Sequence, residues 1–394
     1  MHSPVMTTAT ETRRILDCRH VRGAMNEQPD VLARLSRHVE YFAEQVGELA
    51  AGHGGFRDVV FLAPPRAQAV ALLGKHAVAE RCGPSTAASN AAGSNAEGGE
   101  PAANPLDRRL VIALSPSGED ERVLELAQRA LDAGSSVAAV TNDARSPLAQ
   151  IATLDVDIAA GLELSTSPTK SVTGMMLAAL ALIDGLPDAG LGADEGNTIA
   201  NPATALALAE AVGELLADGE PADVAAARLA RARRVAVIGQ GHHHPAALET
   251  ARMLRETAGL LVEAFSVEEF SDGPMGGFDD GTAVVLLAGS EHTAVHELRA
   301  RLHARSAHVV VIGDFGDVAE PADLPLPPLE AAGAAECILA TVRGQQLAVA
   351  AARALGVDPD RPAVAEAVAP SPVRTQERAS SRSGTEHEGG PGAR

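Results

Sequence analysis

Short apolar runs alternate with helical patterns through the first half of the chain. Residues 110–114 form an apolar run with the length of a buried strand, and residues 136–141 and 155–159 form two more. Between the first two runs, residues 119–132 carry apolar side chains at helical spacing, and Gly134 follows as a typical end of a helix. Strands that alternate with helices favour a parallel sheet. Because ligands of such sheets bind at the carboxyl ends of the strands, the turns there are candidate sites.

The turn after the first of these strands has the residues of an anion-binding cradle. Ser115-Pro116-Ser117-Gly118 ends the strand, because proline and glycine interrupt extended structure, and Asp120 lies at the start of the next helix. Free backbone N–H groups and the positive end of the helix dipole face such a turn, and the two hydroxyls add donors. A simpler interpretation is that Ser115 or Ser117 only caps the helix.

A second turn with several hydroxyl groups follows the third strand. It spans residues 161–170 and precedes an apolar helical run. Both turns therefore lie at carboxyl ends of strands, which favours a shared ligand. The candidate ligand-binding residues of the second turn are Thr166, Ser167, Thr169 and Lys170.

Taken in order, the motifs of this chain resemble the sugar isomerase (SIS) family in its two-domain form, as in the isomerase half of glucosamine-6-phosphate synthases. The resemblance runs from about residue 25 to about residue 368. The motifs that carry it are Met25-Asn26-Glu27-Gln28-Pro29, Ser115-Pro116-Ser117-Gly118-Glu119, Thr141-Asn142, Ser146-Pro147-Leu148, Glu163, Thr169-Lys170, Gly239-Gln240-Gly241, Pro245, Leu248-Glu249, Leu254-Arg255-Glu256, Glu263-Ala264-Phe265 and Gly273-Pro274.

The resemblance implies an α/β fold of two three-layer α/β/α sandwiches, each around a parallel five-stranded sheet of flavodoxin-like type. It also implies a homodimer. Residues 83–106 are small and polar, so we expect a disordered insertion there, and we expect the tail to be disordered from about residue 370. The predicted parts are a helical lead-in (1–45), a first SIS domain (46–188), a linker and helix (189–216), a second SIS domain (217–356) and a tail (357–394).

In the SIS family the turn after the second strand binds a sugar phosphate through serine hydroxyls and backbone N–H groups. The resemblance therefore assigns Ser115, Ser117 and Gly118 to the ligand. The turn after the first strand usually adds a hydroxyl, but here it holds Arg66, which can contact an anion through two N–H groups. The family's threonine at the start of the next helix is Asp120 here, and a carboxylate repels a phosphate unless a cation intervenes. Asp120 also fits as an ordinary acidic residue in a first helical turn. A ligand that carries less charge than a sugar phosphate therefore remains an alternative.

Isomerisation between an aldose and a ketose needs a base that moves a proton between neighbouring carbons. Glu256 occupies the family's base position, and the simpler interpretation is a solvated glutamate that pairs with Arg252 at i,i+4 spacing. Asp272 stands where the resemblance places a ring-opening histidine, and a carboxylic acid can still shuttle protons. The synthase's Schiff-base lysine has no counterpart, and Met253 replaces a lysine on the helix of the base. We therefore do not expect the synthase's imine chemistry.

Metal and cofactor motifs are weak in this sequence. His242, His243 and His244 are adjacent but lack a third ligand at a recognisable spacing, so we expect no metal. Gly239 and Gly241 lack the third glycine of a dinucleotide-binding fingerprint, so we expect no cofactor.

The net charge and the cysteines limit which partners and which cellular compartment we expect. A formal net charge of −20 disfavours general affinity for nucleic acid or an anionic membrane. The three cysteines are isolated, no apolar run reaches the length of a membrane span, and no signal-peptide core is evident. We therefore expect a cytoplasmic protein whose partner is a small sugar derivative.

Two functions stay open at this point. The first is a sugar-phosphate isomerase, or an amino-sugar deaminase or deglycase, with Glu256 as base and the turn at 115–118 as ligand cradle. The second is a non-catalytic protein that senses a sugar derivative. The missing lysine, histidine and hydroxyl favour the second, while Glu256 and the intact turn favour the first. Glutamine-dependent amidotransfer is not expected, since the first residues hold no nucleophilic cysteine.

Overall fold

Nine strands form two parallel sheets in the computed structural model, which describes residues 18–83, 87–90, 108–187, 198–218, 221–289, 293–313, 319–329 and 333–360. The strands are β1 (Asp58–Leu62), β2 (Ala87–Asn90), β3 (Arg109–Leu114), β4 (Ser136–Thr141), β5 (Leu154–Asp157), β6 (Arg234–Gly239), β7 (Val262–Phe265), β8 (Thr282–Ala288) and β9 (His308–Gly313). The first sheet has the order β2-β1-β3-β4-β5 and the second has the order β7-β6-β8-β9.

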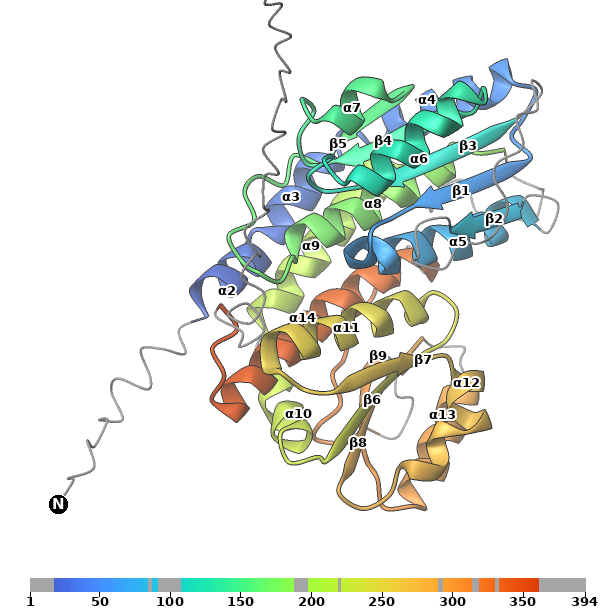
Figure 1. Cartoon of the computed structure of the whole chain (residues 1–394). Helices are drawn as coiled ribbons and strands as arrows, with labels where there is room; N and C mark the ends of the chain where they lie inside the picture. The colour runs from blue at the N-terminus through green and yellow to red at the C-terminus, as the bar shows by residue number, and fades with distance from the viewer. Residues whose placement is uncertain are drawn as a thin grey trace, which may run out of the picture.

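Helices precede, connect and follow these strands (Figure 1). No helix within the described ranges is both long and apolar enough to cross a lipid bilayer. The helices are α2 (Arg19–Asn26), α3 (Gln28–Leu35), α4 (Val39–Gly52), η1 (Pro65–Ala67), α5 (Gln68–Cys82), α6 (Glu121–Asp132), α7 (Pro147–Ile151), α8 (Lys170–Asp184), α9 (Pro202–Ala217), α10 (Pro221–Leu229), α11 (His243–Ala258), α12 (Val267–Asp272), η4 (Pro274–Gly277), α13 (Thr293–His303), η5 (Gly333–Ala335) and α14 (Glu336–Leu355).

The strands confirm the predicted parallel α/β fold, with two differences in detail. The second sheet has four strands among the described residues, one fewer than the five expected. In the first sheet the fifth strand is β2, which falls inside the predicted disordered insertion, so that prediction is wrong for residues 87–90. They pair with β1 from Asp58–Ala87 to Phe61–Asn90.

Parts of the sequence-based organisation lie outside the described residues. These are residues 84–86 and 91–106 of the predicted insertion and the whole of the tail beyond residue 360. The predicted domain boundaries stay a prediction.

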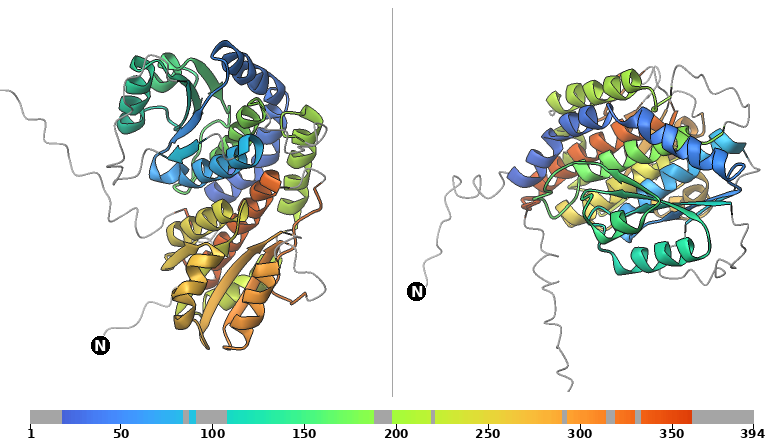
Figure 2. Two further views of the ribbon diagram at one scale, coloured as in Figure 1. Left: turned by 90° about the vertical axis from the view of Figure 1, so that its right-hand side faces the viewer. Right: turned by 90° about the horizontal axis from the view of Figure 1, so that it is seen from above.

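Each sheet has one face towards the middle of the molecule and one outer face (Figures 1 and 2). Val235 and Val237 of β6 lie in the same apolar core as α11, whereas Ala236 and Ile238 lie in the core under α12 and α13. This division follows from the alternation of side chains along a strand. In the first sheet Phe61 belongs to the central core, and a separate core lies under α6 and α7. The two sandwiches therefore share one apolar core through α8, α11 and α14.

Polar side chains also connect the helices at the centre. The amide nitrogen of Gln28 on α3 donates to the side-chain oxygen of Gln345 on α14 at 2.9 Å. The hydroxyl of Thr173 on α8 donates to the amide oxygen of Gln28 at 2.8 Å. All three side chains are buried. An unpaired buried amide is costly, so these bonds favour one arrangement of the three helices.

Histidines meet where α5 of the first half lies against the start of α11. The ring centroids of His76 and His242 are 6.1 Å apart, and His242 also contacts the carboxylate of Glu80. Burial lowers the pKa of His76 below its ordinary value of 6.5, and the neighbouring His242 and His244 lower it further.

We expect acid to weaken this contact. Because the pKa of His76 is lowered by folding, the unfolded chain binds the proton more readily, so stability present above about pH 6.5 is lost as the pH falls. His76→Gln should therefore reduce the loss of stability between about pH 7 and about pH 5, whereas His308→Gln at an exposed position should not. Urea unfolding at several pH values measures this, and an unchanged slope in His76→Gln would contradict it.

Phe61 tests the shared core. Its side chain is fully buried, and a Cβ added to Gly74 of α5 would lie 2.3 Å from its ring, so the two are closely packed. Phe61→Ala should lower the free energy of unfolding by about 3–5 kcal/mol, because it removes apolar contacts and leaves a cavity. Leu261→Ala, at a side chain that is 92% exposed, should change it by less than about 0.5 kcal/mol. Chemical denaturation compares the two variants.

Candidate functional site

The turn after β3 is held in shape by its own polar groups. Gly118 has a φ of +63°, and a Cβ there would lie 2.1 Å from the hydroxyl oxygen of Ser146, so only glycine fits. Ser115 is buried, and its hydroxyl oxygen accepts from the N–H of Gly118 at 3.1 Å. Ser117 is exposed, and its hydroxyl oxygen accepts from the N–H of Glu119 at 3.3 Å. An accepting hydroxyl still carries a proton that it can donate to a ligand.

Asp120 is the N-cap of α6. Its carboxylate accepts from the N–H of Val123 at 2.9 Å. This matches the simpler interpretation of Asp120, because a carboxylate satisfies a free N–H group there and interacts favourably with the helix dipole.

Asn142 connects the first turn to the second. Its backbone N–H donates to the carbonyl of Pro116 at 2.9 Å. Its side-chain amide donates to the carbonyl of Gly161 at 2.8 Å and accepts from the N–H of Ala160 at 2.7 Å. The carboxyl ends of β3, β4 and β5 therefore form one connected edge.

The second turn folds around the carboxylate of Glu163. One oxygen accepts from the N–H and the hydroxyl of Thr169, both at 3.2 Å. The other accepts from the N–H of Ser171 at 3.1 Å and from its hydroxyl at 2.6 Å. Lys170 is buried and forms an ion pair with Glu27. The polar groups predicted for the ligand at Thr169 and Lys170 therefore already have partners within the chain.

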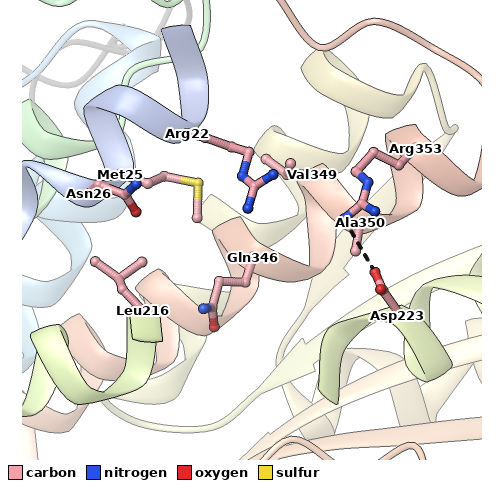
Figure 3. A pocket seen from close by; sticks show the side chains of 9 residues that line it. All are labelled: Arg22, Met25, Asn26, Leu216, Asp223, Gln346, Val349, Ala350 and Arg353. Carbon is pink, nitrogen blue, oxygen red and sulfur yellow. Dashed lines mark ion pairs between the residues drawn. The ribbon is translucent and has the colours of Figure 1, made fainter. Parts of the chain in front are cut away.

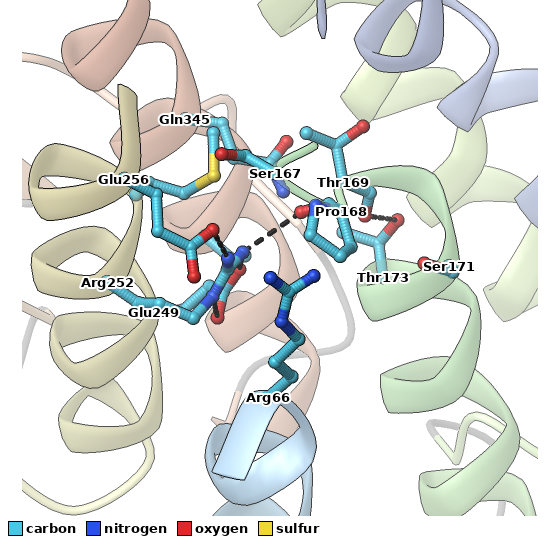
Figure 4. A network of polar contacts seen from close by, with 12 residues as sticks. Arg66, Ser167, Pro168, Thr169, Ser171, Thr173, Glu249, Arg252, Glu256 and Gln345 are labelled. Carbon is cyan, nitrogen blue, oxygen red and sulfur yellow. Dashed lines mark hydrogen bonds and ion pairs between the residues drawn. The ribbon is translucent and has the colours of Figure 1, made fainter. Parts of the chain in front are cut away.

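The remaining residues predicted for the ligand lie where the two halves meet. Arg66 extends from η1 into this junction and donates to the carbonyl of Thr166 at 3.4 Å (Figure 4). Thr166 is exposed. Ser167 is fully buried, and its hydroxyl has no hydrogen-bond partner in the described part of the chain.

An ion cluster on α11 faces this turn from the second half (Figure 4). Arg252 pairs with both Glu249 and Glu256, and it donates to the carbonyl of Pro168 at 3.0 Å. The side chain of Glu249 is 1% exposed and that of Glu256 is 28% exposed. Burial by itself would lower the pKa of Arg252, but the charges of the two glutamates outweigh it and raise that pKa. The guanidinium therefore stays charged and joins the predicted base to the turn of the first half.

The pairing of Glu256 with Arg252 that the simpler interpretation predicted is thus present, with a glutamate that is partly exposed and an arginine that is buried. Sequence reasoning missed the roles of Glu163 and Glu249. The spacing Glu249-x-x-Arg252-x-x-x-Glu256 puts all three charges on one face of a helix and would have indicated the cluster. No sequence pattern indicates the bond to Pro168, because it forms between distant segments.

Asp272 lies apart from this cluster. It is exposed at the end of α12, which covers the outer face of the second sheet, whereas α11 with Glu256 covers the inner face. Within one chain, the fold therefore does not bring the two predicted catalytic carboxylates together. Across the described ranges, no three His, Cys, Asp or Glu side chains are grouped as a metal site would require.

A separate pocket of about 70 Å³ lies among α2, α9, α10 and α14 (Figure 3). An ion pair of 3.7 Å between Arg353 and Asp223 forms part of its wall. None of the residues predicted for the ligand or for catalysis lines this pocket. Its lining is Arg22, Met25, Asn26, Leu216, Asp223, Gln346, Val349, Ala350 and Arg353.

The fold and the connected turns define a double α/β/α protein with two hydroxyl-bearing turns at the carboxyl ends of the strands of its first sheet. Comparison with known families makes this class specific. The model of the SIS domain matches residues 58–184 and 228–325, which together make up more than half of the chain. The chain belongs to the SIS domain family.

Glutamine–fructose-6-phosphate aminotransferases are among the similar proteins. The enzyme of Corynebacterium efficiens is 29% identical over 65% of this chain and 42% of its own length. The enzyme of Acidithiobacillus ferridurans is 30% identical over 66% of this chain and 43% of its own length. The chain thus spans less than half the length of these relatives, and the similarity is to their isomerase domain.

Solved structures share the fold at lower identity. The C-terminal domain of glucosamine-fructose-6-phosphate aminotransferase from Francisella tularensis has a TM-score of 0.74 and 18% identity, over 87% of this chain and 98% of that one. Tagatose-6-phosphate ketose/aldose isomerase from Escherichia coli has a TM-score of 0.70 and 18% identity, over 91% and 96%. Glucosamine-6-phosphate deaminase from Thermotoga maritima has a TM-score of 0.59 and 20% identity, over 86% and 97%.

Asp120 offers a test of the cap. Asp120→Ala should destabilise the protein by about 1 kcal/mol, because the N–H of Val123 loses its acceptor, while Asp120→Asn should cost only a few tenths, roughly. Chemical denaturation measures both. Equal losses for the two variants would show that the charge of Asp120, rather than its cap, stabilises the turn.

Proposed function

We propose that this protein binds a sugar phosphate or an amino-sugar phosphate at the junction of its halves and acts on it as an isomerase or deaminase of the SIS type with altered catalytic residues. The turn at 115–118 offers the hydroxyl of Ser117 and the positive end of the α6 dipole. Arg66 adds a guanidinium that suits a phosphate. The names of the tagatose-6-phosphate isomerase and glucosamine-6-phosphate deaminase of the same fold support this ligand class.

One observation carries the proposal. A series of hydrogen bonds runs from the carbonyl of Pro116 through Asn142 to Gly161 in the first half. The turn at 161–170, which contains Gly161, also contains Pro168. The carbonyl of Pro168 accepts a hydrogen bond from Arg252, and Arg252 forms an ion pair with Glu256. The candidate ligand turn and the candidate base, although far apart in sequence, therefore belong to one connected polar structure.

Glu256 has the chemistry of a proton-transfer base. One of its carboxylate oxygens is held by Arg252, which fixes the carboxylate in place and leaves the other oxygen to act. That oxygen would take the proton from the carbon beside the carbonyl of the open-chain sugar. The electrons of the C–H bond would form a C=C bond while the carbonyl electrons move onto its oxygen, which gives an enediolate. Return of the proton to the neighbouring carbon, with transfer of the hydroxyl proton to the other oxygen, would complete the isomerisation.

The alternative is a non-catalytic protein that senses a sugar derivative. Two observations favour it: Asp272 lies on the far face of the second sheet, and the only lysine near the turn, among described residues, is paired with Glu27. Either function uses the same ligand turn, and turnover separates them.

We also propose a homodimer that acts in the cytoplasm. Leu162 and Leu164 on the second turn are 77% and 63% exposed, and such apolar surface suits contact with a second copy. Cys18, Cys82 and Cys337 form no disulfides, which suits a reducing compartment.

A ligand screen tests the proposal. Fructose 6-phosphate, glucosamine 6-phosphate and their unphosphorylated forms are titrated while unfolding is followed, because a ligand at about 100 times its Kd should add about 2.7 kcal/mol of stability. We expect a phosphorylated compound to stabilise the protein. Arg66→Ala should raise the Kd for that compound about tenfold or more. If no phosphorylated or free sugar binds, the proposal is wrong.

Turnover is measured on the ligand that binds. Exchange of the proton on the carbon beside the carbonyl (C1 of fructose 6-phosphate, C2 of glucosamine 6-phosphate) with deuterated solvent reports proton abstraction, and ammonia release reports deamination. Glu256→Gln should lower exchange at least about 100-fold without loss of binding. Glu210→Gln, at an exposed glutamate on α9, serves as the matched control and should exchange like the wild type. Binding without exchange or ammonia release would support the sensor instead.

A further inference from the structure

We propose that Arg252 is a positioning residue that fixes the orientation of Glu256 and ties it to the turn at 161–170 of the other half. This inference rests on the proposed function, because it assigns Arg252 a role in the proton transfer for which Glu256 is the base. Arg252 belongs to none of the motifs that carry the family resemblance, so its role is read from this chain's own geometry.

The hydrogen bonds of the guanidinium are directional. Its Nε donates to one oxygen of Glu249 at 2.9 Å and its Nη2 to the other, so that pair is bidentate. The same Nη2 also donates to the carbonyl of Pro168 at 3.0 Å, and Nη1 donates to Glu256. Four of the five N–H groups are thus used. The planar group is held in three directions and cannot rotate without breaking several bonds.

The exposures of the two glutamates show that they have different roles. Glu249 is 1% exposed and supplies the countercharge that a buried guanidinium requires. Glu256 is 28% exposed, so it is not needed to fill the interior, and it faces the junction where Arg66 lies (Figure 4). A purely structural arginine would be satisfied by Glu249 and Pro168. The additional bond to Glu256 links the buried pair to the reacting side of the site.

The experiment uses a charge-balanced variant, because Arg252→Gln alone would leave Glu249 buried without a partner and could unfold the protein. Glu249→Gln with Arg252→Gln removes both buried charges together. Arg255→Gln is the control, since Arg255 lies on the same helix, is exposed and donates to the carbonyl of Val262. Two quantities are measured against pH for the full chain: the rate of proton exchange on the bound sugar phosphate, and the affinity of the protein for that sugar phosphate.

In the double variant we expect exchange to fall about tenfold or more at every pH measured, while the affinity for the sugar phosphate falls much less. Arg252→Lys keeps a positive charge but not the fork of N–H groups, so exchange should fall in this variant too. Arg255→Gln should leave exchange and affinity unchanged. A fall in exchange with the affinity retained separates positioning of Glu256 from a general loss of stability, which would lower both.

A folded double variant with the wild-type rate of exchange would overturn the role of Arg252 and leave the proposed function standing. A wild-type protein that binds a sugar phosphate but exchanges no proton would also overturn the role of Arg252, while carbohydrate binding stands. A wild-type protein that binds no sugar at all would overturn the proposed function itself, and this inference with it.

Discussion

A buried guanidinium stays charged only if carboxylates and carbonyls surround it, and this requirement shapes the junction between the two halves. Arg252 meets it with Glu249 beside it on α11 and with the carbonyl of Pro168 from the other half. Neither sandwich supplies all of these partners alone. The position of the turn at 161–170 relative to α11 is therefore coupled to a hydrogen bond whose loss would leave a buried N–H group of the guanidinium without an acceptor.

The apolar packing around this junction is consistent with the composition. Aromatic residues make up only 2% of the chain, so the core is built from small and branched side chains. Nearly every residue of α8 and α14 is buried, which means that these helices are covered on all sides rather than along one stripe. Small side chains allow such helices to approach closely. The two sheets can then share one core, and the polar contacts of Gln28 with Gln345 set the helices within it.

The site combines family features with residues particular to this chain. The turn at 115–118 and Glu256 fit the SIS family, to which the chain belongs. Asp120 serves as a helix cap, Lys170 is held by Glu27, and Arg66 stands where the resemblance places a hydroxyl. These differences leave the residues of the turn at 115–118 as the resemblance has them and alter the groups around it. They are the reason why the function that we propose is an isomerase or deaminase that does not copy the chemistry of the synthases.

The sequence by itself determined the parallel α/β fold, the two hydroxyl-bearing turns and the pairing of Glu256 with Arg252, because these follow from local periodicity, turn residues and helical spacing. It could not give the strand at 87–90, because the residues there carry no strand pattern in the sequence and the pairing is with β1, a distant segment. It also could not show that Asp272 lies on the opposite face from Glu256, or that Arg252 reaches Pro168. Those facts depend on how distant segments pack, and only the tertiary structure decides them.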